Sequence, residues 1–270
     1  MNPPPDPVPD DEAQRARTRL LSRLQAIAAS LAARDDALAL LALGSVGLET
    51  GRIDAHSDLD FFVLVRPQAK GRYLADLAWL DAAHRVVWSF RNTPDGFKAL
   101  MEDGVFCEFA VFDPAELPHI PFAPGRFVWR RDEVDPAWAQ SARPLPQPAD
   151  PDWLAGEALS NLIVGVGRYA RGERLAAMRL IQMHALERLL QLLERRAARV
   201  DGSGDPFSVD RRIEQRRPEL TGLLPVLAGG YDNTPAAALA LLVELERHAP
   251  VPPAVARHIR TLVRAIQAAG

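Results

Sequence analysis

The sequence predicts an α+β fold, in which a region of strands and helices is followed by an all-helical region. Two observations support this prediction. Short apolar runs alternate with helical patterns in the N-terminal half of the chain. Beyond a proline-dense stretch at 134–152, the sequence becomes rich in alanine and leucine with helical periodicity. We therefore expect a disordered tail over 1–10, a first domain over 11–135, a linker over 136–152 and a helical domain over 153–270.

Apolar patterns and the residues that interrupt them predict the elements of the first domain. Apolar side chains at helical spacing predict an amphipathic helix over 11–34, and a second helical pattern covers 71–83. Proline and glycine mark a turn at 94–96, after which we expect a brief helix. Short apolar runs predict strands, and these cover 37–43, 58–65, 85–90, 105–112 and 125–133.

Composition argues against several classes of function. The net charge of −3 is unlike the basic balance of a dedicated nucleic-acid binder. Cys107 is the single cysteine, so neither an intrachain disulfide nor a cysteine-based zinc cluster is expected. The acidic, proline-rich start is unlike a signal peptide, and no apolar run reaches the ~18 residues of a membrane helix. We therefore expect a cytoplasmic protein that needs neither a membrane nor a nucleic acid as a partner.

A glycine and a serine follow the predicted strand over 37–43. Gly44 lets the backbone turn sharply and lets a ligand approach closely, because glycine has no Cβ. Ser45 is expected to begin a helix, where free N–H groups and the helix dipole favour an anion, and its hydroxyl adds a donor. The pair therefore indicates a phosphate-binding turn, although the Walker pattern with its lysine is absent.

Two aspartates, Asp58 and Asp60, stand at the start of the next predicted strand. Side chains two apart share one face of a strand, and their Cα atoms lie roughly 6–7 Å apart. Such a pair can share a hard cation, and Mg²⁺ prefers carboxylates together with substrate phosphates. A polar turn with a capping aspartate would explain Asp58 but not Asp60, which runs directly into an apolar strand. The pattern therefore predicts metal-assisted phosphoryl or nucleotidyl transfer.

Glu108 stands in the middle of the otherwise apolar run 105–112. An unpaired glutamate inside a strand is costly, so this side chain is predicted to face a site. If its strand lies beside 58–65, Glu108 reaches the same cleft and either deprotonates an acceptor hydroxyl or completes the metal site. The alternative is an edge-strand charge, or an ion pair with an arginine such as Arg91.

The Gly44-Ser45 pair, the loop that follows it, the Asp58/Asp60 pair and the later Glu108 together resemble the nucleotidyltransferase superfamily related to DNA polymerase β. The two-domain layout resembles the aminoglycoside and lincosamide nucleotidyltransferases of that superfamily. The resemblance implies a small mixed β-sheet nucleotidyltransferase domain followed by an all-α helical bundle. It implies that Gly44 and Ser45 hold a nucleoside triphosphate. It also implies that Asp58, Asp60 and Glu108 surround magnesium, with two ions expected, and that Glu108 acts as the base or only as a metal ligand.

Basic residues near these motifs are candidates for binding the nucleotide. Arg52 and His56 lie in the loop between Ser45 and Asp58, and we predict that both contact the nucleotide. Arg91 and Lys98 flank the same segments. Each of these side chains, taken alone, is more typical of a solvated surface residue.

A G-x-G pattern at 165–167 lies inside a helical pattern and does not follow a strand. It therefore indicates close helix packing or a helix break and no dinucleotide site. The alanine-rich helices of the same region can pack on each other or on a second copy of the chain, so a homodimer stays open.

The expected activity is transfer of a nucleoside monophosphate, AMP from ATP, onto a hydroxyl of a small molecule such as an aminoglycoside or lincosamide antibiotic. One alternative is a nucleotidyltransferase that modifies a protein, as toxin-neutralising enzymes do. Another is a catalytically silent nucleotide-binding regulatory module. The sequence shows no motif that would select ATP over another nucleoside triphosphate.

Overall fold

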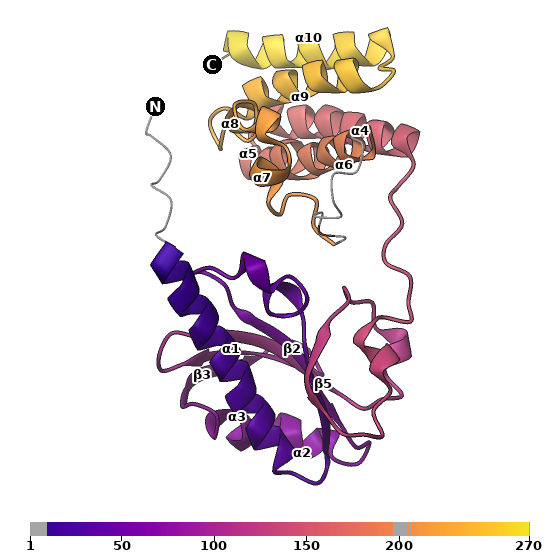
Figure 1. The fold of residues 1–270 in the computed structure, drawn as a ribbon. Coiled ribbons are helices and arrows are strands. Elements are labelled where there is room, and N and C mark those ends of the chain that lie inside the picture. The colour runs from indigo at the N-terminus through magenta and orange to yellow at the C-terminus, as the bar shows by residue number, and fades with distance from the viewer. Residues whose placement is uncertain (1–9, 197–204, 206, 270) are drawn as a thin grey trace. The chain divides into compact units, whose positions relative to one another are not determined.

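The computed structural model describes residues 10–196, 205 and 207–269, and the chain divides into two compact units, 1–145 and 146–270 (Figure 1). The disordered tail expected over 1–10 lies outside the described residues, except for residue 10, which begins a helix. The domain boundaries stay a prediction.

A six-stranded mixed sheet forms the centre of the first unit. Its strand order is β3-β4-β5-β2-β1-β6, and every neighbouring pair is antiparallel except β2 and β5, which are parallel. Five of these strands were predicted from apolar runs. The bounds are β1 (Ala37–Ala42), β2 (Leu59–Val65), β3 (Val86–Arg91), β4 (Gly96–Met101), β5 (Phe106–Phe112) and β6 (Arg126–Arg130).

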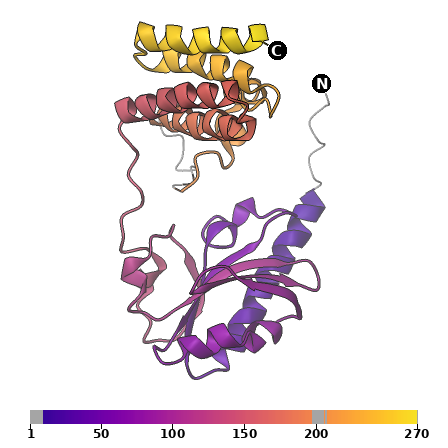
Figure 2. The same ribbon diagram turned by 180° about the vertical axis from the view of Figure 1, so that it is seen from behind.

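Helix α1 (Asp10–Ala32) covers one face of this sheet (Figures 1 and 2). Its apolar stripe buries Leu20, Leu24, Ile27 and Leu31 against the inward-facing side chains of the strands. Two short helices, α2 (Lys70–Ala75) and α3 (Ala78–Asp81), contribute further buried side chains to the same core. Short 3-10 turns complete the unit, namely η1 (Gly44–Val46), η2 (Thr50–Arg52), η3 (Leu117–His119) and η4 (Pro136–Ala139).

The opposite face of the sheet is covered only in part. Leu41, Leu64 and Phe112 pack there under the segment that carries Leu117 and Phe122. Toward β3 and β4 the same face is more open, and the side chains of β3 are mostly exposed. This open part of the sheet adjoins the carboxylates described in the next subsection.

Two predictions about the first unit were wrong. The brief helix expected after the turn at 94–96 is strand β4, whose Phe97, Ala99 and Met101 alternate toward the core with the period of a strand. The single helix expected over 71–83 is two helices. The chain leaves α2 at Asp76, whose carboxylate accepts a hydrogen bond from the N–H of Ala78, the first residue of α3, at 2.8 Å.

The second unit contains helices and no strand among its described residues. Its longest helix, α4 (Pro151–Ala170), begins at Asp150, whose carboxylate accepts from two backbone N–H groups of the first turn. The sequence DGSGDP at 201–206, which predicts a break in the helical pattern, lies outside the described residues, apart from Asp205. The other helical segments are α5 (Arg174–Met178), the π-helical η5 (Arg179–Ala185), α6 (Leu186–Arg196), α7 (Ile213–Arg216), η6 (Pro218–Leu220), α8 (Leu224–Leu227), α9 (Thr234–His248) and α10 (Pro253–Ala269).

The glycines of α4 show why the G-x-G pattern is no dinucleotide site. A Cβ on Gly165 would lie 2.6 Å from the side chain of Ile181, so glycine allows α4 and η5 to pack closely. Gly172 follows the end of α4 with a φ of +83°. The six-stranded sheet of the first unit and the helices of the second confirm the α+β fold class. None of the helices in the described ranges is long and apolar enough to cross a bilayer.

A hydrogen bond between Tyr73 and Asp36 makes the stability of the first unit depend on pH. The Tyr73 hydroxyl donates to Asp36 at 2.6 Å and, with Arg72, holds the pKa of that carboxyl below its ordinary value. A lowered pKa in the folded state stabilises the fold above the unfolded-state pKa, and this contribution disappears as pH falls through the folded-state pKa. Tyr73→Phe should therefore destabilise the protein by about 1 kcal/mol near neutral pH.

The difference between Tyr73→Phe and the wild type should shrink below a pH of about 4, and urea unfolding at several pH values measures it. Phenylalanine keeps the buried ring, since Tyr73 is only 3% exposed. An equal loss of stability at neutral and acid pH would show that the loss does not depend on the charge of Asp36.

Candidate functional site

The parallel pairing of β2 and β5 brings two predicted site residues together. Asp60 and Glu108 are Cα partners across this pair, so they lie one strand spacing, about 4.8 Å, apart. Paired residues project from the same face of a sheet. Leu59 and Cys107, the preceding partners, are fully buried on the other face. The two carboxylates therefore project from the face that α1 does not cover.

Asp58 directly precedes β2 and is half-buried, as is Asp60. The turn before it is closed by another residue, because Asp54 accepts hydrogen bonds from the N–H of His56 and the hydroxyl of Ser57. The capping role that could have explained Asp58 as a turn residue thus belongs to Asp54. Asp58 stands just before the strand, two residues from Asp60, and could supply a second oxygen ligand to a metal ion held by Asp60.

Gly44 permits the Asp60 carboxylate to lie against the Gly44-Ser45 turn. A Cβ on Gly44 would lie 2.7 Å from Oδ2 of Asp60, and Gly44 has a φ of +55°, where an L side chain is strained. The N–H of Leu43 donates to the Asp60 carbonyl at 2.8 Å and fixes the two segments together. The glycine is therefore required both by the backbone and by the neighbouring carboxylate.

One expectation about Ser45 was wrong. The residue is half-buried in η1, a single 3-10 turn of three residues, and does not begin a helix. A turn this short has no helix dipole to favour an anion. Any phosphate bound here would rely on the Ser45 hydroxyl and on the backbone N–H groups of the turn.

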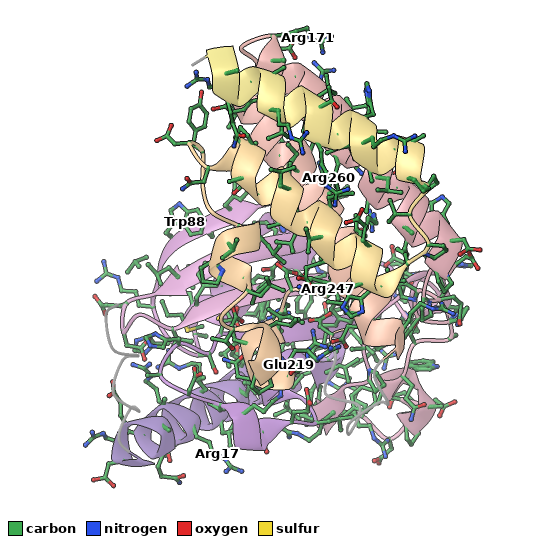
Figure 3. The ribbon with its side chains drawn as sticks, turned by 90° about the horizontal axis from the view of Figure 1, so that it is seen from above. Arg17, Trp88, Arg171, Glu219, Arg247 and Arg260 are labelled. Atoms are coloured by element: carbon green, nitrogen blue, oxygen red, sulfur yellow. The ribbon has the colours of Figure 1, made fainter. Side chains whose placement is uncertain are left out.

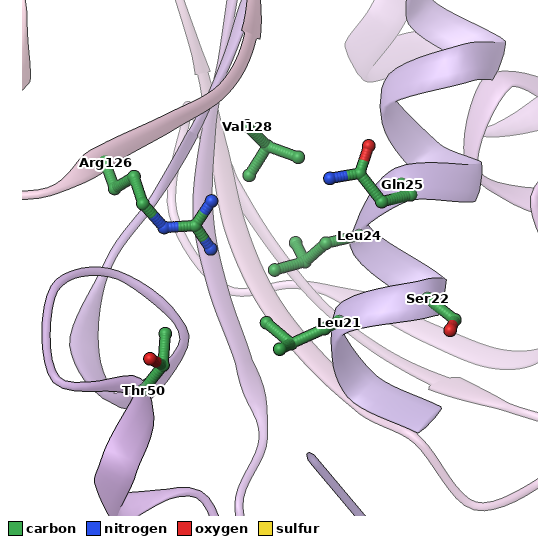
Figure 4. Close-up of a pocket in the computed structure, with 7 residues that line it drawn as sticks. All are labelled: Leu21, Ser22, Leu24, Gln25, Thr50, Arg126 and Val128. Atoms are coloured by element: carbon green, nitrogen blue, oxygen red, sulfur yellow. The ribbon is translucent and has the colours of Figure 1, made fainter. Parts of the chain in front are cut away.

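Arg126 holds this turn from the neighbouring strand β6, a contact that the sequence analysis did not predict. Its guanidinium donates to the carbonyls of Val46 and Gly47, both at 3.0 Å. Figure 4 shows it in a pocket of about 370 Å³ between α1 and the loop that carries Thr50. Arg126 lies about 80 positions along the chain from the carbonyls that it binds, so no local pattern could connect them.

Glu108 has a charged partner, which corrects the argument made for it from the sequence. The Lys98 ammonium of β4 lies 3.1 Å from Oε2 of Glu108, and the side chain of Glu108 is 44% exposed. The carboxylate is therefore neither buried nor unpaired. The alternative pairing with Arg91 is also wrong, since Arg91 donates to the Pro94 carbonyl and lies over the Phe97 ring.

The two basic residues of the loop have local contacts. Arg52 forms an ion pair with Glu49 across one turn of η2. His56 is exposed in the turn that Asp54 closes. A role for either in binding nucleotide stays a prediction.

The donor set was tested for its fit to a metal ion. Within the part of the chain that the structure describes, no group of three or more His, Cys, Asp or Glu side chains is placed to hold a metal. Asp58 and Asp60 nevertheless supply carboxylate oxygens only, which suit a hard cation such as Mg²⁺. Mg²⁺ usually takes one or two carboxylates and completes its shell with substrate phosphates and water. These two residues therefore fit magnesium bound together with a nucleotide.

Cys107 takes no part in this chemistry. It is fully buried on the core side of β5, and burial raises the pKa of its thiol to about 12, with the charges of Asp58 and Asp60 adding to the effect. A thiol with so high a pKa is almost wholly protonated at neutral pH and is a poor nucleophile. The reactive groups at this edge of the sheet are oxygens.

The comparisons with known proteins found similar solved structures. The chain is similar to an aminoglycoside 6-adenyltransferase from Bacillus subtilis, with 13% identity over 92% of this chain and 98% of that one and a TM-score of 0.37. It is also similar to a nucleotidyltransferase-like protein from Exiguobacterium sibiricum, with 13% identity over 84% and 74% and a TM-score of 0.35. A third is CdnC of E. coli in a complex with HORMA-deltaN, with 13% identity over 95% and 92% and a TM-score of 0.31.

No family model matches the chain, and no curated protein matches it in sequence. Two of the three are named as an adenyltransferase and a nucleotidyltransferase-like protein. At 13% identity and TM-scores below 0.5, they add no argument for a particular activity. The case for function therefore depends on the geometry of the site.

The contact between Gly44 and Asp60 predicts a large effect of one added methyl group. Gly44→Ala should destabilise the fold by about 1–2 kcal/mol, because alanine is strained at positive φ. It should also weaken binding of Mg·ATP, because the new Cβ displaces the Asp60 carboxylate. Thermal unfolding and titration calorimetry measure the two effects.

Gly51→Ala is the matched control, because a Cβ there would meet no heavy atom within 4 Å. It should leave both quantities close to those of the wild type. If the two variants behave alike, the close approach of Gly44 to Asp60 has no consequence for the site.

Proposed function

We propose that this chain is a magnesium-dependent nucleotidyltransferase that moves a nucleoside monophosphate, AMP from ATP, onto the hydroxyl of a small molecule. One observation carries the proposal. The Asp60 carboxylate lies against the Gly44-Ser45 turn on one side and opposite Glu108 on the other. The turn proposed to bind phosphate, the acid proposed to bind the metal and the proposed base thus follow one another across neighbouring strands.

Each residue has a defined part in the proposed reaction. The backbone of Gly44 and the hydroxyl of Ser45 bind the triphosphate, while Asp58 and Asp60 hold Mg²⁺. When bound, the ion neutralises charge on the phosphates and so favours attack at the α-phosphorus. Glu108 accepts the proton of the acceptor hydroxyl. The acceptor oxygen forms a bond to the α-phosphorus, and the bond from that phosphorus to the oxygen bridging to the β-phosphate breaks, releasing pyrophosphate.

Two further residues position these groups. Lys98 orients the Glu108 carboxylate through their ion pair, and Arg126 fixes the turn through the Val46 and Gly47 carbonyls. A turn held in advance loses less conformational entropy when the triphosphate binds. Positioning and charge neutralisation would be the main sources of rate acceleration.

Removing the charge of Asp60 should abolish transfer. Asp60→Asn and Asp58→Asn should each lower turnover of labelled ATP by about 100-fold or more, because an amide holds Mg²⁺ more weakly than a carboxylate and the phosphate charge is then no longer neutralised. Asp54→Asn is the control, since Asp54 closes the neighbouring turn and holds no proposed ion. Incubation with labelled nucleoside triphosphates, Mg²⁺ and a panel of hydroxyl-bearing small molecules, followed by mass spectrometry, detects the product.

The same experiment distinguishes the alternatives. A modified protein in place of a modified small molecule would favour a protein-modifying enzyme. Nucleotide binding without turnover, unchanged in Asp60→Asn, would favour a regulatory module and contradict the proposal.

Glu108→Gln separates the base from the metal site. Loss of the base should lower kcat by about 100-fold or more while the KM for ATP changes little, because glutamine keeps the shape but cannot take the proton. Glu102→Gln is the matched control, since Glu102 is exposed and pairs with Arg85. A rise in the KM for Mg·ATP in place of a fall in kcat would show that Glu108 holds the ion and is not the base.

A further inference from the structure

Two large aromatic side chains lie exposed on edge strand β3. Trp88 is 49% exposed and Phe90 is 54% exposed. Their rings stack with centroids 6.3 Å apart and planes inclined by 26°. Figure 3 shows Trp88 at the edge of the sheet. Exposed aromatic rings that are stacked on each other still leave ring faces and edges open to contact other rings.

This surface is in register with the candidate site. Phe90 is the Cα partner of Lys98, Lys98 is the partner of Glu108, and Glu108 is the partner of Asp60. Directly paired residues share a face, so all four project from the face that α1 leaves uncovered. At about 4.8 Å per strand, the row extends roughly 14 Å from Asp60 to Phe90.

A second row beside the first is apolar. Trp88 is the partner of Leu100, and Leu100 is the partner of Phe106. Leu100 and Phe106 are half-buried, so they add partly accessible apolar surface next to Lys98 and Glu108. We call the face formed by Trp88, Phe90, Leu100 and Phe106 the aromatic platform.

The order of the strands places this platform on the acceptor side of the reaction. The Gly44-Ser45 turn, where the triphosphate would lie, follows β1 on one side of Asp60, and Glu108 lies on the other side. The attacking and leaving oxygens of a phosphoryl transfer are roughly in line. If pyrophosphate leaves toward β1, the acceptor approaches over Glu108 from the side of β4 and β3.

We propose that the aromatic platform binds the acceptor and that the acceptor carries a flat aromatic ring beside its reactive hydroxyl. This inference rests on the proposed function, because it uses the direction of transfer. The charges of the two rows support it. Asp60 and Glu108 are engaged in the reaction, and Lys98 balances Glu108. A polycationic aminoglycoside needs several carboxylates free to bind it. Stacked rings beside the balanced Lys98–Glu108 ion pair suit a planar apolar molecule instead.

The test uses the full chain and umbelliferone, a planar phenol whose own fluorescence reports binding. The wild type should bind it without nucleotide, and Trp88→Ala and Phe90→Ala should each weaken binding by about ten-fold, the usual effect of losing one stacking ring. Trp88→Phe should restore most of the affinity. Trp153→Ala is the matched control, since Trp153 is 50% exposed in the other unit, and it should change nothing.

Three outcomes would overturn the inference. The first is equal binding of umbelliferone by the wild type and Trp88→Ala. The second is displacement of umbelliferone by Mg·ATP in the Glu108→Gln variant, which would place the nucleobase on the platform. The third is an oligomer of the wild type that dissociates in Trp88→Ala, as measured by light scattering, while the affinity for umbelliferone is unchanged. The platform would then be an interface between copies of the chain.

The inference and the proposed function can fail separately. If umbelliferone binds through Trp88 but Mg·ATP does not bind at all, the proposed function is wrong and the platform is a binding site for another purpose. If Mg·ATP is turned over and kanamycin is modified equally by the wild type and Trp88→Ala, the enzyme is confirmed and the platform is not its acceptor site.

Discussion

The parallel pairing of β2 with β5 is the constraint on which the candidate site depends. It sets Asp60 directly opposite Glu108, and both neighbouring strands extend the same row, with Lys98 on one side and the Gly44-Ser45 turn on the other. A slip of one residue in this register would turn either carboxylate into the core beneath α1. The fully buried Leu59 and Cys107 oppose such a slip, because it would expose them to water. Core packing and site geometry are therefore specified by the same pairs.

The site is held mainly by groups that do no chemistry themselves. Arg126 bonds two carbonyls after the turn, Leu43 bonds the Asp60 backbone, and Lys98 pairs with Glu108. Arg126 reaches across about 80 positions of the chain, whereas the other two contacts join segments that are near in the sequence. The sheet thus performs two tasks, since one face builds a hydrophobic core with α1 while the other carries polar and aromatic groups within a few strand spacings of each other.

Local patterns were enough to predict most strands, the amphipathic helix α1 and the glycine turn, because each of these depends on neighbours in the chain. Strand β4 was missed because its six residues between two turns suit a short helix equally well until their partners on β3 and β5 are known. Lys98 and Arg126 could not be assigned for a related reason. Their partners, Glu108 and the Val46 and Gly47 carbonyls, are chosen by strand order, which a single sequence does not state. The argument for Glu108 placed it beside Asp60, as the strand pairing does, but from a wrong premise, since the side chain is paired and partly exposed.

The single cysteine is one residue from Glu108 and faces the opposite side of the same strand. Its thiol is sealed in the core, so it can meet a solution reagent only when β5 separates locally from its neighbours. The rate at which the Cys107 thiol reacts with such a reagent therefore reports how often β5 opens, and no label has to be engineered. A ligand bound to the polar face of β5 would lower this reaction rate, although it lies on the opposite face of the sheet from Cys107.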